Sequence, residues 1–258
     1  MYRLPLAAYR VLDLGPTAAV AYAARLLGDA GAEVIAVDRE TVMATPRSSG
    51  YRQVNRNKLG CTLDFATPSG AGLLRRLVSL CDVVIDGFDA TEREQLGLNY
   101  DALRASRPDL IVASIDGGHG RDSSLDDVVA GTAAAAAACA ALLHHRDTGE
   151  GQHVEVDARD CLRSFVGGPG GVVSLPAHEE LPADSRLRER HFFEPVSTMS
   201  GVEEMPALPW RFSLTPCHVR LPAPEPGQHN RYVFGLLGLS EAEMADLERE
   251  GVIGAILE

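Results

Sequence analysis

The chain has 258 residues, of which 45% are hydrophobic, so it can bury a large core and does not have the composition of a disordered protein. Its formal net charge of −12 argues against binding to nucleic-acid phosphates or anionic lipid headgroups. No signal-peptide pattern opens the sequence, and the apolar run at residues 133–143 is too short to cross a bilayer. We therefore expect a soluble cytoplasmic protein with no nucleic-acid or membrane partner.

The first predicted elements form a strand–helix–strand unit. Residues 10–14 have the pattern of a buried strand, residues 16–30 that of a helix, and residues 32–38 that of a second strand. Such a unit predicts a parallel sheet. The turn Gly15-Pro16-Thr17 lacks the glycines of a dinucleotide-binding turn, so Asp38 at the end of the second strand is weak support for a dinucleotide site.

Strands and helices continue to alternate up to residue 166. Helices are predicted at residues 69–80, 100–106 and 127–146, and strands at residues 61–64, 82–85, 110–115 and 152–156. Residues 167–209 are rich in glycine and proline, which is typical of an extended connection. Residues 210–214 then have a strand pattern, and Ser240 with Glu243 forms a capping box that opens a helix. The fold class is therefore α/β, with a Rossmann-like parallel sheet flanked by helices.

Residues 39–58 reverse the charge of the chain locally. They hold five basic residues, including the only lysine, Lys58, against one acid. A focused positive patch in an acidic protein is typical of a site for a small anionic ligand. A solvated basic loop explains the pattern equally well.

Metal and disulfide chemistry are not indicated by the sequence. The five cysteines form no CxxC pair, and we expect them to be free and mostly buried. The eight histidines show no metal-ligand spacing, so no metal site is predicted.

Four stretches of the chain carry a family resemblance. In chain order they are RVLDLGPTAAVAYAARLLGDAGAEVIAVDRE, VNRNKLGCTLDFATPSGAGLLRRLV, LGLNYDALRASRPDLIVASIDGG and DVVAGTAAAAAACAALLHHRDTGEGQHVEV. A fifth, LPWRFSLTP with LGLSEAEMADLEREGVI, is similar to a C-terminal return to the large domain. On these stretches the chain resembles the family III CoA-transferases, which include formyl-CoA transferase, carnitine CoA-transferase and α-methylacyl-CoA racemase.

The resemblance implies a domain organisation. Residues 1–166 correspond to the large α/β domain, residues 167–209 to an extended connection or a remnant of the small domain, and residues 210–258 to a segment that completes the large domain. Family members are longer, and most of their small domain has no counterpart here. We therefore expect a more open site, or one closed by another chain. Because family members are interlocked dimers, the resemblance also implies a homodimer.

Asp127, at the start of the alanine-rich helix, is where the resemblance places the catalytic aspartate. Free N–H groups at a helix start favour the ionised carboxylate, which can attack an acyl thioester, and backbone N–H groups near Gly117 and Gly118 are candidates to bind the oxyanion. On spacing alone, a helix cap is the better interpretation of Asp127. His119 is a second candidate, as a general base, although a solvated loop histidine is the simpler interpretation.

The resemblance also suggests where CoA, as co-substrate, would be contacted. These positions are Arg39, Asn55, Arg56, Asn57, Lys58, Phe88, Ala18 and Ala19. Phe88 could stack on the adenine, with a core phenylalanine as the alternative. Several family donors are replaced, because a glutamine-alanine pair aligns with Ala18-Ala19, and other polar or basic positions align with Gly87, Gln95 and Asp116. Charge-assisted hydrogen bonds contribute about 1.5–3 kcal/mol each, so these replacements leave CoA binding open.

The sequence leaves three functions open. The first is an acyl-CoA:carboxylate CoA-transferase that forms aspartyl anhydride and thioester intermediates, with a small acyl-CoA or carboxylate as substrate. The second is a diverged, CoA-independent enzyme with isomerase, racemase, dehydratase or decarboxylase chemistry. The third is a non-catalytic subunit of a hetero-oligomeric CoA-transferase.

Overall fold

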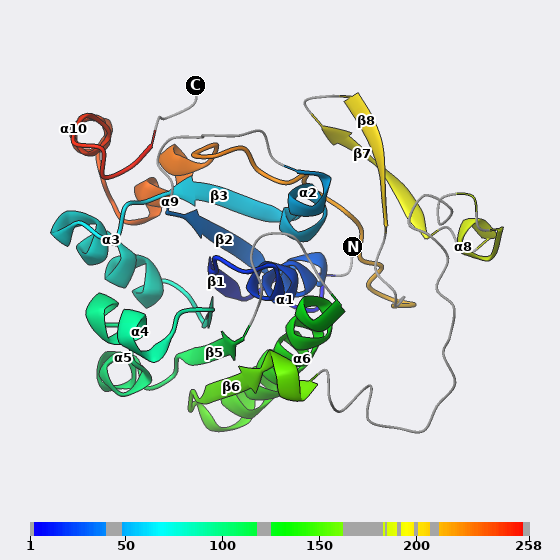
Figure 1. Ribbon diagram of the computed structural model, residues 1–258, viewed down its shortest axis with the longest axis horizontal. Helices are drawn as coiled ribbons and strands as arrows, with labels where there is room; N and C mark the ends of the chain where they lie inside the picture. Colours follow the sequence, from blue (N-terminus) through cyan, green and yellow to red (C-terminus); the bar gives the residue numbers. More distant parts are fainter. Residues whose placement is uncertain are drawn as a thin grey trace.

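The computed structural model describes residues 3–39, 48–117, 125–161, 183, 185–189, 192–198, 201–206 and 212–254. Its strands are β1 (Arg10–Leu14), β2 (Glu33–Asp38), β3 (Lys58–Thr62), β4 (Val83–Asp86), β5 (Ile111–Asp116) and β6 (His153–Asp157). They form one parallel sheet in the order β3-β2-β1-β4-β5-β6 (Figure 1). The predicted α/β fold is confirmed, and the strand order reverses between β1 and β4, which is the Rossmann arrangement.

Helices bury both faces of this sheet, which explains why its strands are nearly continuous apolar runs. One face packs against α1 (Ala18–Asp29) and α6 (Leu125–Thr148), and α2 (Ser49–Asn55) lies beside α1. The other face packs against α3 (Pro68–Ser79), α4 (Ala90–Leu96), α5 (Tyr100–Ser106), α9 (Asn230–Leu236) and α10 (Glu241–Arg249). The two hydrophobic clusters therefore lie on opposite sides of one sheet.

Helix α6 is long and apolar enough to cross a membrane by length and composition alone. Here it is a core helix, because its buried alanines pack against α1 and the sheet. At Gly131 the two helices come so close that an added Cβ would lie 2.6 Å from the Ala19 carbonyl oxygen. This contact of small residues fixes the first turn of α6, which carries Asp127, against α1.

The C-terminal residues lie against strand β3. The side-chain amide of Asn230 accepts a hydrogen bond from the Thr62 N–H at 2.9 Å and donates one to the Gly254 carbonyl at 2.9 Å. Leu63 and Ile253 form an antiparallel bridge, and Phe234 is buried in the same cluster as the β3 side chains. Helix α10 begins at the predicted capping box of Ser240 and Glu243.

Most predicted elements up to residue 157 are confirmed, with ends that agree within two residues. Strand β3 is an exception, because it begins at Lys58, three residues before the prediction, so the basic run ends inside the sheet. Helices α2, α4 and α9 were not predicted. The strand expected at residues 210–214 is wrong for its described part, residues 212–214, which has no strand structure.

The stretch expected to be an irregular connection contains regular structure. Its described residues include the short helix α8 (Ser185–Glu189) and an antiparallel hairpin of β7 (Phe193–Thr198) and β8 (Gly201–Pro206). The hairpin touches the main body through polar contacts, such as Arg52 to Glu203 at 3.5 Å. Alternation in this hairpin is weak, since charged and apolar residues do not separate cleanly onto two faces, and this explains why it was missed.

Candidate active site

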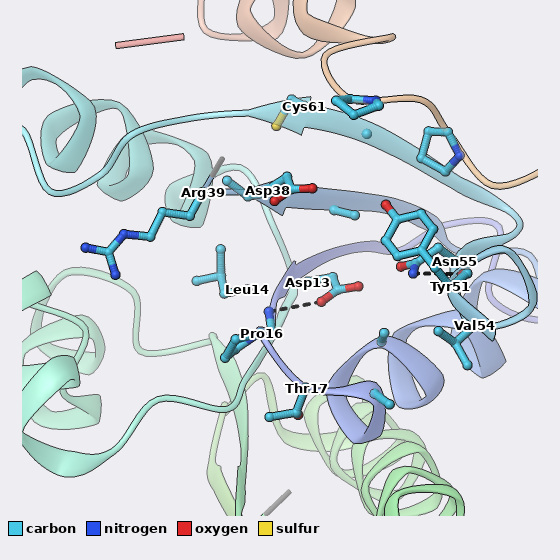
Figure 2. A pocket seen from close by; sticks show the side chains of 18 of the residues that line it. Asp13, Leu14, Pro16, Thr17, Asp38, Arg39, Tyr51, Val54, Asn55 and Cys61 are labelled. Carbon is cyan, nitrogen blue, oxygen red and sulfur yellow. Dashed lines mark hydrogen bonds between the residues drawn. The ribbon is translucent and has the colours of Figure 1, made fainter. Parts of the chain in front are cut away.

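A cavity of about 140 Å³ lies at the carboxyl ends of the central strands. Its lining includes the β1–α1 turn, the end of β2 and part of α2 (Figure 2). Phe88 after β4 and residues 224–227 line it as well. Open α/β sheets bind ligands at this edge, near the point where the strand order reverses. Since a cavity of about 150 Å³ holds one benzene molecule, the enclosed part has room for a single ring system, and a larger ligand would extend out of its open side.

The floor of the cavity is held by a buried lysine. Lys58 Nζ donates to Asp13 Oδ2 at 2.7 Å, to Asn55 Oδ1 at 2.8 Å and to the Ala21 carbonyl at 2.8 Å. The other oxygen of Asp13 accepts from the Gly15 N–H at 3.1 Å and so shapes the β1–α1 turn (Figure 2). Burial lowers the pKa of Lys58. Lys58 thus positions Asp13 and Asn55, which line the cavity, without lining it itself.

A second buried network surrounds Asp29 at the end of α1. Arg56 Nη2 donates to Asp29 Oδ2 at 2.9 Å, and Arg25 Nε donates to the same oxygen at 3.2 Å. Arg56 also donates to the Pro206 carbonyl, which ties the hairpin to the sheet. Desolvation and the neighbouring Arg56 charge lower the pKa of Arg25. Arg56 therefore fills a structural position inside the molecule.

Residues 220–229, here called the cover segment, close one side of the cavity. Asn57 holds one end, because its Oδ1 accepts from the N–H groups of residues 220–221 at 2.6 and 2.9 Å. His229 holds the other end, because its Nδ1 accepts from the Gly60 N–H at 3.0 Å and its own N–H donates to the Gly60 carbonyl at 2.9 Å. A Cβ on Gly60 would lie 2.7 Å from Pro224 Cγ, so glycine permits this close approach.

The expected basic patch is corrected by these contacts. Arg56 and Lys58 are 0% and 1% exposed, and each is paired with a carboxylate that the sequence places far away. Of the described residues that line the cavity, only Arg39 is basic, and its guanidinium lies 5.3 Å from the centre of the Phe65 ring. Four lining residues are acidic: Asp13, Asp38, Glu92 and Glu225. The cavity is therefore acidic where a cationic site was expected.

The predicted CoA contacts separate into two groups. Those that line the cavity are Ala18, Arg39, Asn55 and Phe88, and those that do not are Ala19, Arg56, Asn57 and Lys58. Ala19 is buried in the contact between α1 and α6. Phe88 packs edge-on against Phe65, with ring centres 5.9 Å apart, and is 5% exposed, so it is also part of the core.

Asp127 lies in the first turn of α6 and is 0% exposed. It is one helical turn before Gly131, which meets α1, so its side chain belongs to the buried face of α6. It does not line the cavity, although α6 begins at the same edge of the sheet. Gly117, after β5, is exposed and has a φ of +78°, while Gly118 and His119 lie outside the described residues.

Arg93, which no sequence pattern singled out, bridges two strand ends. Arg93 Nε donates to Asp86 Oδ1 at 2.8 Å, and its Nη2 donates to Asp116 Oδ1 at 2.9 Å. Desolvation lowers the pKa of Arg93, but the hydrogen bond to Asp86 raises it, and the net pKa is raised. Ser114 Oγ donates to the other oxygen of Asp86 at 2.8 Å. Two aspartates that end neighbouring parallel strands were the signal, because strand ends meet at one edge.

The thiol of Cys61 also lines the cavity. Burial raises the pKa of Cys61, so the group stays protonated near neutral pH and offers no thiolate. Cys81 is buried as well, and burial raises its pKa to about 12. Cys139, however, is exposed on α6. Within the described residues, no three His, Cys, Asp or Glu side chains are grouped as a metal site.

Comparisons with known proteins show which family part of the chain is similar to. Residues 6–126 match the model of CoA-transferase family III. The succinate–glutarate CoA-transferase of Agrobacterium fabrum is 35% identical over 129 residues, which cover 44% of this chain and 32% of that protein. A probable fatty acyl-CoA transferase of Mycobacterium tuberculosis, Rv3272, is 34% identical over 145 residues, covering 50% of this chain and 37% of that protein.

The aligned region thus spans about a third of the length of these curated relatives. The crystal structure of Rv3272 superposes with a TM-score of 0.76 at 20% identity, covering 88% of this chain and 98% of that chain, which establishes the fold. Through residues 6–126 the chain is a relative of CoA-transferase family III, and its fold is the fold of that solved structure.

Proposed function

We propose that the chain is an acyl-CoA:carboxylate CoA-transferase in which Asp127 is the nucleophile. The observation that carries this proposal is the placement of Asp127 in the first turn of α6, at the edge of the sheet where the cavity also lies. Unpaired N–H groups and the helix dipole favour a carboxylate at a helix start. Relatives named as CoA-transferases support the reaction class.

The reaction then proceeds by exchange of acyl groups on one carboxylate. Asp127 attacks the thioester carbonyl of the donor, which forms a mixed anhydride and releases the CoA thiolate. The thiolate attacks the aspartyl carbonyl, which gives an aspartyl thioester and frees the donor carboxylate. The acceptor carboxylate attacks this thioester, which forms a second anhydride and releases the CoA thiolate. The thiolate then attacks the acceptor carbonyl of that anhydride, which forms the new acyl-CoA and regenerates the Asp127 carboxylate. No proton is gained or lost overall.

The cavity fits only part of CoA. Its volume suits the adenine ring or the ribose, beside Phe88 and Arg39. The phosphates and the thiol-bearing arm would lie outside it, toward the start of α6. Because Arg39 is the single basic residue on the described cavity wall, we expect weaker CoA binding than in a site lined by several cations.

Intact-protein mass spectrometry tests the assignment. After incubation with succinyl-CoA, the wild type should gain the mass of CoA less water, and tandem fragmentation should place the adduct on Asp127. Asp127→Asn should show no adduct, whereas the neighbouring, half-buried Asp126→Asn should keep it. An adduct that persists in folded Asp127→Asn, or none in the wild type with any acyl-CoA of a representative set, contradicts the proposal.

A second function is favoured by one observation, the complete burial of Asp127. A chain with this carboxylate closed off could act as a non-catalytic subunit that completes the site of a longer homologue. In that case the adduct would form on the homologue after mixing, and not on this chain. We also propose a cytoplasmic homodimer, and a monomer by light scattering at micromolar concentration would contradict the dimer.

A further inference from the structure

We propose that Arg93 is a positioning residue for CoA binding, and that it acts through Asp86 on the turn that carries Phe88. This inference rests on the proposed function only in taking the ligand of the cavity to be a CoA thioester. It concerns how tightly that ligand is bound, and not the chemistry at Asp127. Arg93 is not one of the residues that line the cavity, so its effect has to pass through its neighbours.

The hydrogen bonds of Asp86 are the first argument. Asp86 Oδ1 accepts from Arg93 Nε at 2.8 Å and from the Phe88 N–H at 3.2 Å, and Oδ2 accepts from Ser114 Oγ at 2.8 Å. Asp86 is 3% exposed, and Ser114 is fully buried. A buried carboxylate needs a compensating cation, and a satisfied polar network of this kind is rigid. Arg93 supplies the cation and therefore fixes the oxygen that holds the backbone of Phe88.

The turn of residues 86–88 is the second argument, because it forms part of the cavity wall. The Phe88 ring lines the cavity and packs edge-on against Phe65, which lines it too, with ring centres 5.9 Å apart. A Cβ on Gly87 would lie 3.3 Å from Thr17 Oγ1, so the turn also packs closely against the β1–α1 turn. Since both turns face the same cavity, a shift of residues 86–88 changes the shape that a ligand meets.

The same arginine ties helix α4 to the sheet. Arg93 lies on α4 directly after Glu92, which lines the cavity. None of the seven residues of this helix is buried, although Leu96 packs against the core. The Arg93 side chain, which is 12% exposed, reaches from the helix to the ends of β4 and β5 through Asp86 and Asp116. Loss of this link should therefore loosen two parts of the cavity wall, the turn before α4 and the helix itself.

Isothermal titration calorimetry with CoA tests this role, with urea unfolding measured on the same variants. Arg93→Met should weaken CoA binding on the order of tenfold, which corresponds to the loss of one aromatic contact to the ligand. Arg107→Met is the matched control. Arg107 also makes two hydrogen bonds of 2.9 Å to an aspartate, Asp109, but at the amino ends of the strands, away from the cavity. It should lose stability without losing affinity for CoA.

Two further variants separate the parts of the bridge. Asp116→Asn removes the charge of the exposed partner, since the Asp116 side chain is 54% exposed, and should keep the wild-type affinity for CoA. Arg93→Lys keeps the positive charge and loses the planar fork that reaches two carboxylates. Its affinity should lie between those of the wild type and Arg93→Met.

Equal CoA affinities in Arg93→Met and Arg107→Met overturn the proposal, whether or not both fall below the wild type. A loss in Asp116→Asn as large as in Arg93→Met also overturns it, as does a wild type that binds no CoA. If Arg93→Met does not fold, wild-type affinity in Arg93→Lys overturns it instead. The expected affinities without any adduct at Asp127 would refute the proposed function and leave this inference intact, and an adduct with equal affinities would do the reverse.

Discussion

Replacing Lys58 with methionine tests whether the basic run serves the fold. The side chain of Lys58 is 0% exposed, and its ammonium makes three hydrogen bonds, one of them to Asp13, whose side chain is 5% exposed. Methionine has a similar volume but leaves the Asp13 carboxylate buried without its cation. Breaking a buried ion pair in this way costs about 3–5 kcal/mol. For a chain of this size, that loss lowers the Tm by about 6–20 °C.

Urea unfolding followed by circular dichroism measures this loss. The double variant Asp13→Asn/Lys58→Met should recover part of the free energy, since no charge is then left unpaired. Arg52→Met is the matched control from the same basic run, because Arg52 is partly exposed and pairs with Glu203 at 3.5 Å. We expect it to cost less than about 1 kcal/mol. A cost for Lys58→Met equal to that of Arg52→Met would refute the reasoning.

Two further predictions concern the ends of the cover segment. Asn57 has a φ of +58°, so Asn57→Ala should lose about 1 kcal/mol more stability than Asn57→Gly, as measured by urea unfolding. Both variants lose the same side-chain hydrogen bonds, and alanine adds backbone strain. Equal losses of stability in the two variants would exclude strain. Burial lowers the pKa of His229, so its stabilisation is present above the unfolded pKa of about 6.5 and is lost as the pH falls through the folded value. Between about pH 7.5 and 5.5, the wild type should lose more stability than His229→Gln, and parallel pH profiles would contradict this.

The regular part of the fold was predictable because each element carries a local signal. Buried parallel strands are short apolar runs, and helix starts such as Asn99 and Ser240 carry side-chain caps that the structure confirms. The two-stranded hairpin lacked such a signal, since its strands place charges and apolar residues on both faces. Helix α2 was hidden because its sequence also reads as a basic loop.

The site was less predictable than the fold, because its charges are paired across the sequence. Lys58 and Arg56 find their partners at Asp13 and Asp29, which are 45 and 27 residues away, and no local pattern links them. A count of charges within one window therefore predicted a cationic surface. The acidic lining of the cavity comes partly from Glu225, which the cover segment brings back to the sheet.

Residues 55–60 shape the cavity in two different ways, and this affects how ligand-binding data on their variants should be interpreted. Asn55 lines the cavity directly, whereas Asn57 and Gly60 act through the cover segment that they hold. A substitution at Asn57 would release residues 220–221 and shift the wall formed by residues 224–227, although Asn57 itself touches no ligand space. Loss of ligand binding in an Asn57 variant would therefore accompany loss of stability. An exposed residue that lines the cavity, such as Arg39, should instead change affinity without an equal change in unfolding free energy, so measuring both quantities separates the two roles.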